Sequence, residues 1–308
     1  MKDLLKKENN SGQALLIIII ALSAIVTVVL SVVSRSVIDV RTTSKQEESV
    51  RAFSAAEAGV EKALVTGSVG SVITDSGELQ SANYSANVTN FAQGQPRFVH
   101  PKELISGDSA TIWFVSHDPN TNSLVCNPPT SPCFTGNSMR ICWGNAGTSG
   151  STATTPAIEV SVLYDPTANG NYSDVAVARA TYDPNSSRRG SNSFAAPSAG
   201  TCTIDGVTFP FQATVNLGAG GLNIPASAYG SQNGLQLAKL RLLYNTGIAH
   251  SVGIDVSATG SNLPGQGRRV VSTGTSGEST RRVEVFTLFS DAPSIFDSVV
   301  FSPAGITK

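Results

Sequence analysis

Four cysteines are the residues whose type most directly predicts covalent chemistry in this chain: Cys126, Cys133, Cys142 and Cys202. Four thiols allow three disulfide pairings, and disulfides form in oxidising compartments outside the cytoplasm. A zinc site is not indicated, because the sequence has no C-x-x-C spacing and no nearby pair of histidines. We favour the pairs Cys126–Cys133 and Cys142–Cys202, the first of which would close a proline-rich loop.

One stretch, "HDPNTNS", offers oxygen ligands of the kind that calcium prefers. Asp118, Asn120 and Asn122 follow the D-x-N-x-N order that begins a calcium-binding loop. The glycine and the terminal glutamate of such a loop are missing at the expected offsets. An Asp-Pro turn is therefore the favoured interpretation and a calcium site the alternative, and no other metal or cofactor is expected.

The sequence contains no set of residues that predicts catalysis. His100, His117 and His250 are scattered, neither G-x-S-x-G nor H-E-x-x-H occurs, and no glycine cluster has the context of a nucleotide-binding loop. The net charge of −1 and the pI near 6.3 argue against nucleic-acid binding, which needs a basic surface. We expect neither an enzyme nor a nucleic-acid-binding protein.

The long element that opens the chain is apolar from residue 14 to residue 33, with Ser23, Thr27 and Ser31 as its polar members. At 1.5 Å per residue a helix of this length spans about 30 Å, the thickness of a bilayer core. The three hydroxyls recur every four residues, so they lie on one helical face, where they bond back to carbonyls or admit another helix. Lysines precede the run, which places its N-terminal end in the cytoplasm.

Helical spacing of apolar residues continues beyond the run, with no turn signal before Gly59. We predict one helix over residues 13–66, of which 14–33 cross the membrane or enter a filament core. Small residues near its end are expected to lie under a sheet, with a contact to another subunit as the alternative: Ala52, Ala55, Ala56, Ala58, Gly59 and Ala63.

Residues 67–308 alternate between short apolar-polar runs and Gly- or Ser-rich connectors, which predicts strands. The expected strands are 84–90, 110–116, 138–144, 157–165, 175–183, 208–215, 235–245, 250–258, 268–274 and 281–289. A bulge is expected near Lys239. Structureless connectors are expected at 127–132, 185–200 and 260–267. The arginine pairs 188/189, 268/269 and 281/282 are expected to be solvated strand ends. The predicted fold class is α+β: a long N-terminal transmembrane helix followed by a mostly antiparallel, sandwich-like globular head.

Two segments resemble a known family. The stretch "SGQALLIIIIALSAIVTVVLS" is similar to the prepilin signal of type IV pilins and pseudopilins, and "RAFSAAEAGVEKAL" resembles the helix end of PilX-like minor pilins. The resemblance implies that residues 1–12 are a leader, that a prepilin peptidase cuts between Gly12 and Gln13, and that Gln13 becomes the N-methylated terminus. The tail "PSIFDSVVFS" is also similar to such proteins.

The sequence departs from the family at Ile17, where pilins carry a glutamate as the fifth residue of the mature chain. That carboxylate neutralises the N-terminal ammonium of a neighbouring subunit in the apolar filament core. A missing glutamate is characteristic of a pseudopilin at the filament tip, and an accessory subunit incorporated rarely is the alternative.

The resemblance implies a structural function: a minor pilin or pseudopilin that initiates, caps or decorates a pilus-like filament. Its partners would be other pilin subunits along the N-terminal helix, the prepilin peptidase and an inner-membrane assembly platform. It would be a single-pass membrane protein before assembly and lie in a pilus or at the cell surface afterwards. The alternative is an uncleaved, membrane-anchored surface adhesin.

Overall fold

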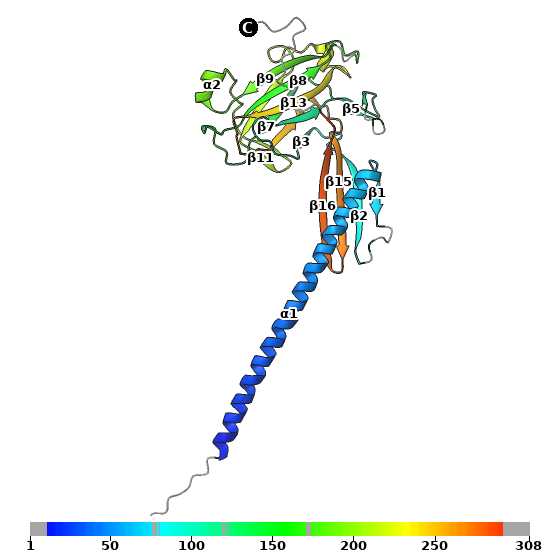
Figure 1. Cartoon of the computed structure of the whole chain (residues 1–308). Helices are drawn as coiled ribbons and strands as arrows, with labels where there is room; N and C mark the ends of the chain where they lie inside the picture. The colour runs from blue at the N-terminus through cyan, green and yellow to red at the C-terminus, as the bar shows by residue number, and fades with distance from the viewer. Residues whose placement is uncertain are drawn as a thin grey trace, which may run out of the picture. The chain divides into compact units, whose positions relative to one another are not determined.

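The computed structural model describes residues 11–75, 79, 81–118, 121, 123–170 and 174–291. The predicted leader to residue 10 and the segment "PSIFDSVVFS" lie outside these ranges. The fold is α+β, with one long apolar N-terminal helix followed by mostly antiparallel sheets, as predicted (Figure 1).

Helix α1 runs from Ser11 to Thr66 without interruption. It contains no proline, and no glycine lies between Gly12 and Gly59, so this stretch holds neither of the two residues that most disfavour a helix. Gly67 follows the last helical residue, in agreement with the common use of glycine just after a helix. The expected helix over 13–66 is confirmed.

The described part of the chain forms two compact units. The first contains residues up to 65 together with 72–86 and 271–283, and the second contains 66–71, 87–270 and the residues from 284 onward. Each is described by itself below.

In the first unit, the second half of α1 packs on a sheet. The sheet has the order β1-β2-β15-β16, with β1 at Val72–Thr74, β2 at Asn83–Phe91, β15 at Gly267–Ser276 and β16 at Ser279–Leu288. Residues 87–91 of β2, 267–270 of β15 and 284–288 of β16 belong to the second unit. The small helix residues Ala52, Ala55, Ala56 and Ala63 are all at most 1% exposed. Their expected place under the sheet is confirmed.

Two four-stranded sheets dominate the second unit, with the orders β12-β7-β14-β3 and β4-β13-β8-β9. The bounds are β3 Arg97–Val99, β4 Ser109–Trp113, β7 Ser138–Trp143, β8 Ala157–Tyr164, β9 Ala176–Tyr182, β12 Phe211–Asn216, β13 Leu235–Leu243 and β14 Val252–Asp255. The pairings recorded within both sheets are antiparallel. One core cluster joins them, with side chains such as Ile141 and Ile254 from the first sheet and Val160 and Leu240 from the second.

Smaller elements complete this unit. Two-stranded sheets are formed by β5 Ser116–His117 with β6 Leu124–Val125, and by β10 Cys202–Ile204 with β11 Val207–Phe209. The short helices are α2 Ser186–Asn192, α3 Ala226–Tyr229 and the 3-10 turn η2 Ser257–Thr259.

Three local predictions need correction. Residues 185–200 are not structureless, because Asn185 caps helix α2 by accepting bonds from the backbone N–H groups of Ser187 and Arg188. The arginine pair 188/189 therefore lies on a helix, not at a strand end. The irregularity in β13 falls between Leu235 and Leu237, before the expected position at Lys239.

Candidate functional site

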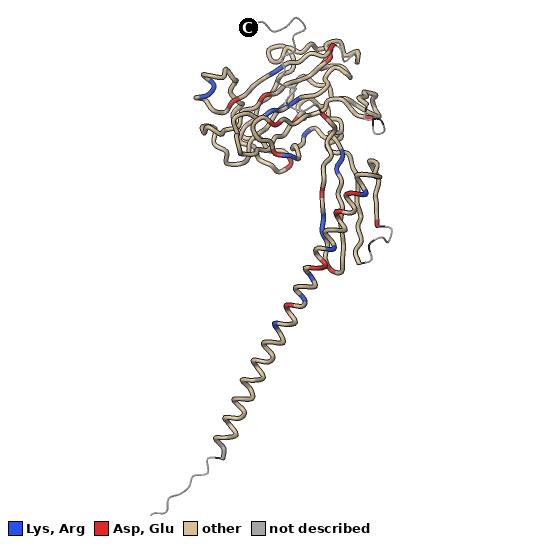
Figure 2. Tube along the Cα trace, in the orientation of Figure 1, with Lys and Arg blue, Asp and Glu red and all other residues tan. Residues whose placement is uncertain are grey.

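The first half of α1 is an apolar surface that nothing in the described structure covers. Its large side chains from Leu15 to Val33 are between 46% and 65% exposed. The first charged residue of the described helix is Arg35, so the apolar half carries no charge (Figure 2). The helix is long and apolar enough to cross a membrane.

The hydroxyls of the apolar half bond to their own helix. Ser23 Oγ donates to the carbonyl of Ile20 at 2.9 Å, and Thr27 Oγ1 donates to the carbonyl of Ala24 at 2.8 Å. The prediction of bonding back to the preceding turn is confirmed at these two positions, and Ser31 lies exposed one turn further on. A hydroxyl satisfied within its own helix can enter an apolar medium without an unpaired polar group.

The residues of the predicted cleavage site, Gly12 and Gln13, lie in the first turn of α1. The expected cut therefore falls at the boundary between the predicted leader and the apolar half of the helix. Ile17 is 65% exposed, and the apolar half of the helix around it contains no carboxylate.

Both predicted disulfides form in the second unit. Cys126 bonds to Cys133 with a Cα–Cα distance of 5.4 Å, and Cys142 bonds to Cys202 at 6.0 Å. The second bond is fully buried and packs with Ile204 and Phe209.

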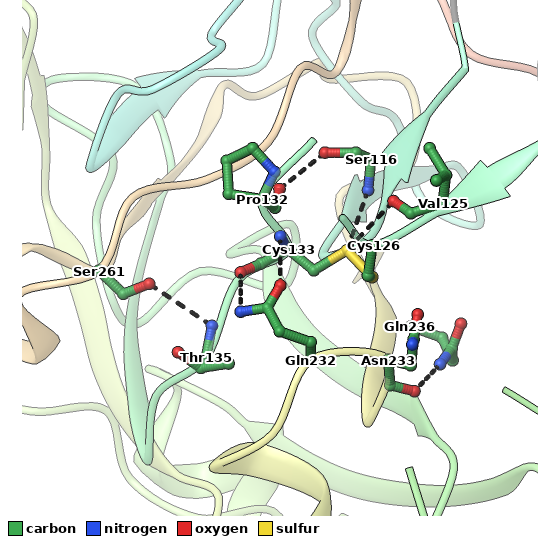
Figure 3. The surroundings of a disulfide bond; sticks show 10 residues. All are labelled: Ser116, Val125, Cys126, Pro132, Cys133, Thr135, Gln232, Asn233, Gln236 and Ser261. Carbon is green, nitrogen blue, oxygen red and sulfur yellow. Dashed lines mark hydrogen bonds between the residues drawn. A yellow bond between two sulfur atoms is a disulfide. The ribbon is translucent and has the colours of Figure 1, made fainter. Parts of the chain in front are cut away.

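The first disulfide closes the loop from 127 to 132, and neighbouring groups fix its base (Figure 3). Ser116 Oγ donates to the carbonyl of Pro132 at 2.7 Å. The carboxamide of Gln232 accepts from the N–H of Cys133 at 2.8 Å and donates to its carbonyl at 3.2 Å.

Asp118, from the calcium-like stretch, hydrogen bonds to Thr121 close by in the sequence. Its Oδ1 accepts from both the N–H and the hydroxyl of Thr121, at 2.8 and 3.0 Å. Both bonds reach a residue only three positions along the chain, and the Asp-Pro turn stays the favoured prediction for this stretch. Asn120 and Asn122 lie outside the described residues, and within the described ranges no three His, Cys, Asp or Glu residues gather where they could hold a metal ion.

The rings of His100 and His250 lie within hydrogen-bond distance of backbone groups. His100 and His250 are buried, and burial is the main cause that lowers the pKa of each. His100 Nδ1 lies 2.8 Å from the carbonyl of Lys102, and His250 Nδ1 accepts from the N–H of Asn145 at 3.2 Å. Both rings hold local backbone in place.

The sequence did not predict a cavity of about 440 Å³ in the second unit, which is lined by His117, Arg268 and Phe289 among others. These residues are far apart in the sequence and belong to no motif. The sequence held one indication that two of them lie close together: Arg268 begins one predicted strand and Phe289 ends the next.

Comparisons with protein-family models, curated proteins and solved structures found no match.

Proposed function

We propose that this chain is a minor subunit of a type IV pilus-like filament, cut after Gly12 by a prepilin peptidase and packed into the filament through the first half of α1. Assembly would take it from the inner membrane, with its N-terminus in the cytoplasm, to a pilus or the cell surface. Its partners are other pilin subunits and the membrane platform that assembles them, and it has no catalytic role.

One observation carries this proposal: the same unbroken helix has an uncovered apolar half and a half that packs under a sheet. Apolar side chains in the first half are half exposed or more, whereas Ala52 and Ala56 in the second half are 0% exposed. Such exposure is stable only in lipid or against other apolar helices. In the membrane, lipid would cover this apolar half before assembly. In a filament core, the apolar helices of other subunits would cover it.

The absence of a carboxylate at Ile17 supports a place at the filament tip. A carboxylate in the core is useful where it pairs with the terminal ammonium of a neighbour, and an unpaired one is costly. A subunit with no neighbour on that side has nothing to pair with. Incorporation as an occasional accessory subunit is the alternative.

We propose a sandwich-like, extracytoplasmic head. Side chains of both four-stranded sheets share one core, as expected for sheets packed face to face. The two disulfides support an oxidising environment outside the cytoplasm.

The mass of the native protein tests the proposal. Loss of residues 1–12 with a methylated Gln13 is expected in cells that contain a prepilin peptidase, and Gly12→Leu should leave the leader attached. Ser11→Ala is the matched control and should be cut normally.

The rival function is an uncleaved, membrane-anchored surface adhesin. An intact chain from Met1 to Lys308 in the membrane of peptidase-positive cells would contradict the filament proposal and favour the adhesin. Surface-exposed protein that is sheared off together with pilus filaments would favour the filament subunit.

A further inference from the structure

The cavity of about 440 Å³ in the second unit has the size of a small-molecule site, for which ~300–1,000 Å³ is usual. Its walls come from β2, β5 and β15, from the end of β16, and from the loop that the Cys126–Cys133 bond closes. A site assembled from so many segments of one unit is held by the whole fold and not by one loop.

Hydroxyl and carboxamide groups make up most of the polar wall. Ser116, Thr130 and Ser131 contribute hydroxyls, and Asn90 and Gln93 contribute carboxamides that hydrogen bond to each other. Hydroxyls and carboxamides both donate and accept, so they match a ligand that carries several hydroxyl groups.

An aromatic pair forms another part of the wall. The rings of His117 and Phe289 stack with centroids 3.8 Å apart and planes inclined by 13°, and Trp113 meets His117 edge-on at 4.5 Å. A stacked pair is a rigid apolar surface of the kind on which the C–H face of a sugar ring packs.

Arg268 is the source of charge in the cavity. Burial lowers the pKa of His117 to about 4, although a hydrogen bond with the backbone of Val115 acts in the opposite direction. The His117 ring is therefore neutral at pH 7. No aspartate or glutamate lines the described wall. Within the described chain Arg268 forms no ion pair, and its guanidinium makes one long bond of 3.5 Å to the carbonyl of Gly67. Its neighbour Arg269, in contrast, is paired with Glu284.

We propose that this cavity binds an acidic monosaccharide unit, with Arg268 receiving the carboxylate, the carboxamides and hydroxyls receiving the sugar hydroxyls, and the aromatic wall receiving the ring face. A half-buried arginine with free donors suits a carboxylate, which it can bind through two parallel hydrogen bonds. A peptide is less well matched, because the usual peptide sites offer an open strand edge, an apolar groove or an arginine cluster.

The disulfide-closed loop is fixed before any ligand arrives. The bonds from Ser116 to Pro132 and between Gln232 and Cys133 hold its base, and Thr130 and Ser131 on it face the cavity. Fixing a binding loop in advance lowers the entropy lost on binding.

Titration of the full chain in detergent, followed by saturation-transfer NMR and calorimetry, tests the site. The probes are D-galacturonate and its neutral counterpart D-galactose, which differ in one carboxylate. Galacturonate should bind at least about tenfold more tightly, and added NaCl should weaken its binding. Arg268→Gln should remove this preference, whereas Arg269→Gln, the adjacent arginine outside the cavity, should keep it.

The proposal is overturned if the wild-type chain binds neither sugar, if it binds both equally, or if the two arginine variants lose affinity alike. The NaCl titration on the wild-type chain needs no variant, so it decides the charge requirement even if Arg268→Gln misfolds. Cleavage after Gly12 plays no part in this experiment, and its result is independent of the filament proposal.

Discussion

Asp183 is a carboxylate with no exposed surface, and its oxygens are fully engaged. Arg188 donates to both of them, at 2.8 and 2.7 Å, while the N–H of Asn185 and the carboxamide of Asn192 add one bond each at 2.8 Å. The guanidinium of Arg188 also lies 4.0 Å from the centre of the Tyr244 ring. This network fixes helix α2 to the end of β9.

Replacing Asp183 with asparagine should lower the free energy of unfolding by about 3 to 5 kcal/mol, because the half-buried charge of Arg188 loses its partner. Burial alone would raise the pKa of Asp183, but the bonds from Arg188, Asn185 and Asn192 outweigh it and hold the pKa below its ordinary value. The stabilisation is therefore fully present above about pH 4 and is lost as the pH falls through the lowered pKa.

Urea denaturation of the wild-type chain and Asp183→Asn at pH 7 and at pH 3 measures this effect. The difference in the free energy of unfolding between the two proteins should be large at pH 7 and smaller at pH 3. Glu61→Gln, an exposed carboxylate on α1, is the control and should change little at either pH. A difference in the free energy of unfolding that is the same at both pH values would contradict a stabilising role for the Asp183 carboxylate.

The sequence predicted the contacts of some single residues and not those of others. The cysteines were paired correctly, because few pairings exist and the short Cys126–Cys133 loop is geometrically simple. The arginine at 188 was misplaced because its partner Asp183 lies at the end of a strand, and polar residues in a serine-rich segment look like a connector. The cavity residues were missed because only the folded sheets bring them together.

At the scale of elements, α1 and its sheet approach unusually closely. A Cβ atom added at Gly59 would lie 2.7 Å from the Tyr84 ring and 2.3 Å from Ser272 Oγ, and one added at Gly274 would lie 2.0 Å from the carbonyl oxygen of Ala52. Alanines on the helix and glycines in the strands permit this approach.

Gly59→Ala should therefore destabilise the first unit, by about 1 to 3 kcal/mol, although alanine is the better helix former. Gly190→Ala on helix α2 is the matched control, since a Cβ there meets nothing within 4 Å. That variant should be neutral or more stable by up to about 1 kcal/mol. Thermal unfolding of the two variants and the wild-type chain measures this difference. If the two variants have equal melting temperatures, the helix does not pack on the sheet as described.

The disulfides should contribute unequally. The Cys126–Cys133 bond spans a sequence separation of 7 and the Cys142–Cys202 bond one of 60. Loop-closure entropy then predicts losses of about 2 and about 4 kcal/mol when each pair is replaced by alanines. Melting curves of the two double variants compare them, and a larger loss for the shorter loop would contradict the entropic account.

At the scale of the whole molecule, the apolar half of α1 should matter for location and not for folding. Ile25 is 64% exposed near the middle of that half. A charge there should add roughly 2.5 to 3.5 kcal/mol to the free energy of membrane insertion. Ile25→Arg is therefore expected to lower the fraction of the protein recovered in the membrane, whereas Ile25→Leu should leave that fraction unchanged.

The near-ultraviolet circular dichroism of the Ile25→Arg protein should match that of the wild type, because this half of the helix supports no part of the sheets. A loss of the folded signal in that variant would show that the apolar half is a structural element of the head.

The α+β class, the long helix and most of the ten expected strands could be predicted, because they depend on local periodicity. Short strands such as β3 and β10 were not predicted, since a run of three residues carries no periodic signal. The expected strand over 208–215 is divided at Pro210, between β11 and β12, and the structure joins each part to a different sheet.

The packing of Ala52, Ala55 and Ala56 under the sheet also decides where a soluble fragment should start. Removing the whole helix at residue 66 would uncover the apolar face of the first unit and produce an aggregating protein. Starting instead between Arg35 and Lys45 discards the membrane-length stretch and keeps the residues that the sheet needs. A fragment that needs no detergent should therefore begin in the middle of the first helix.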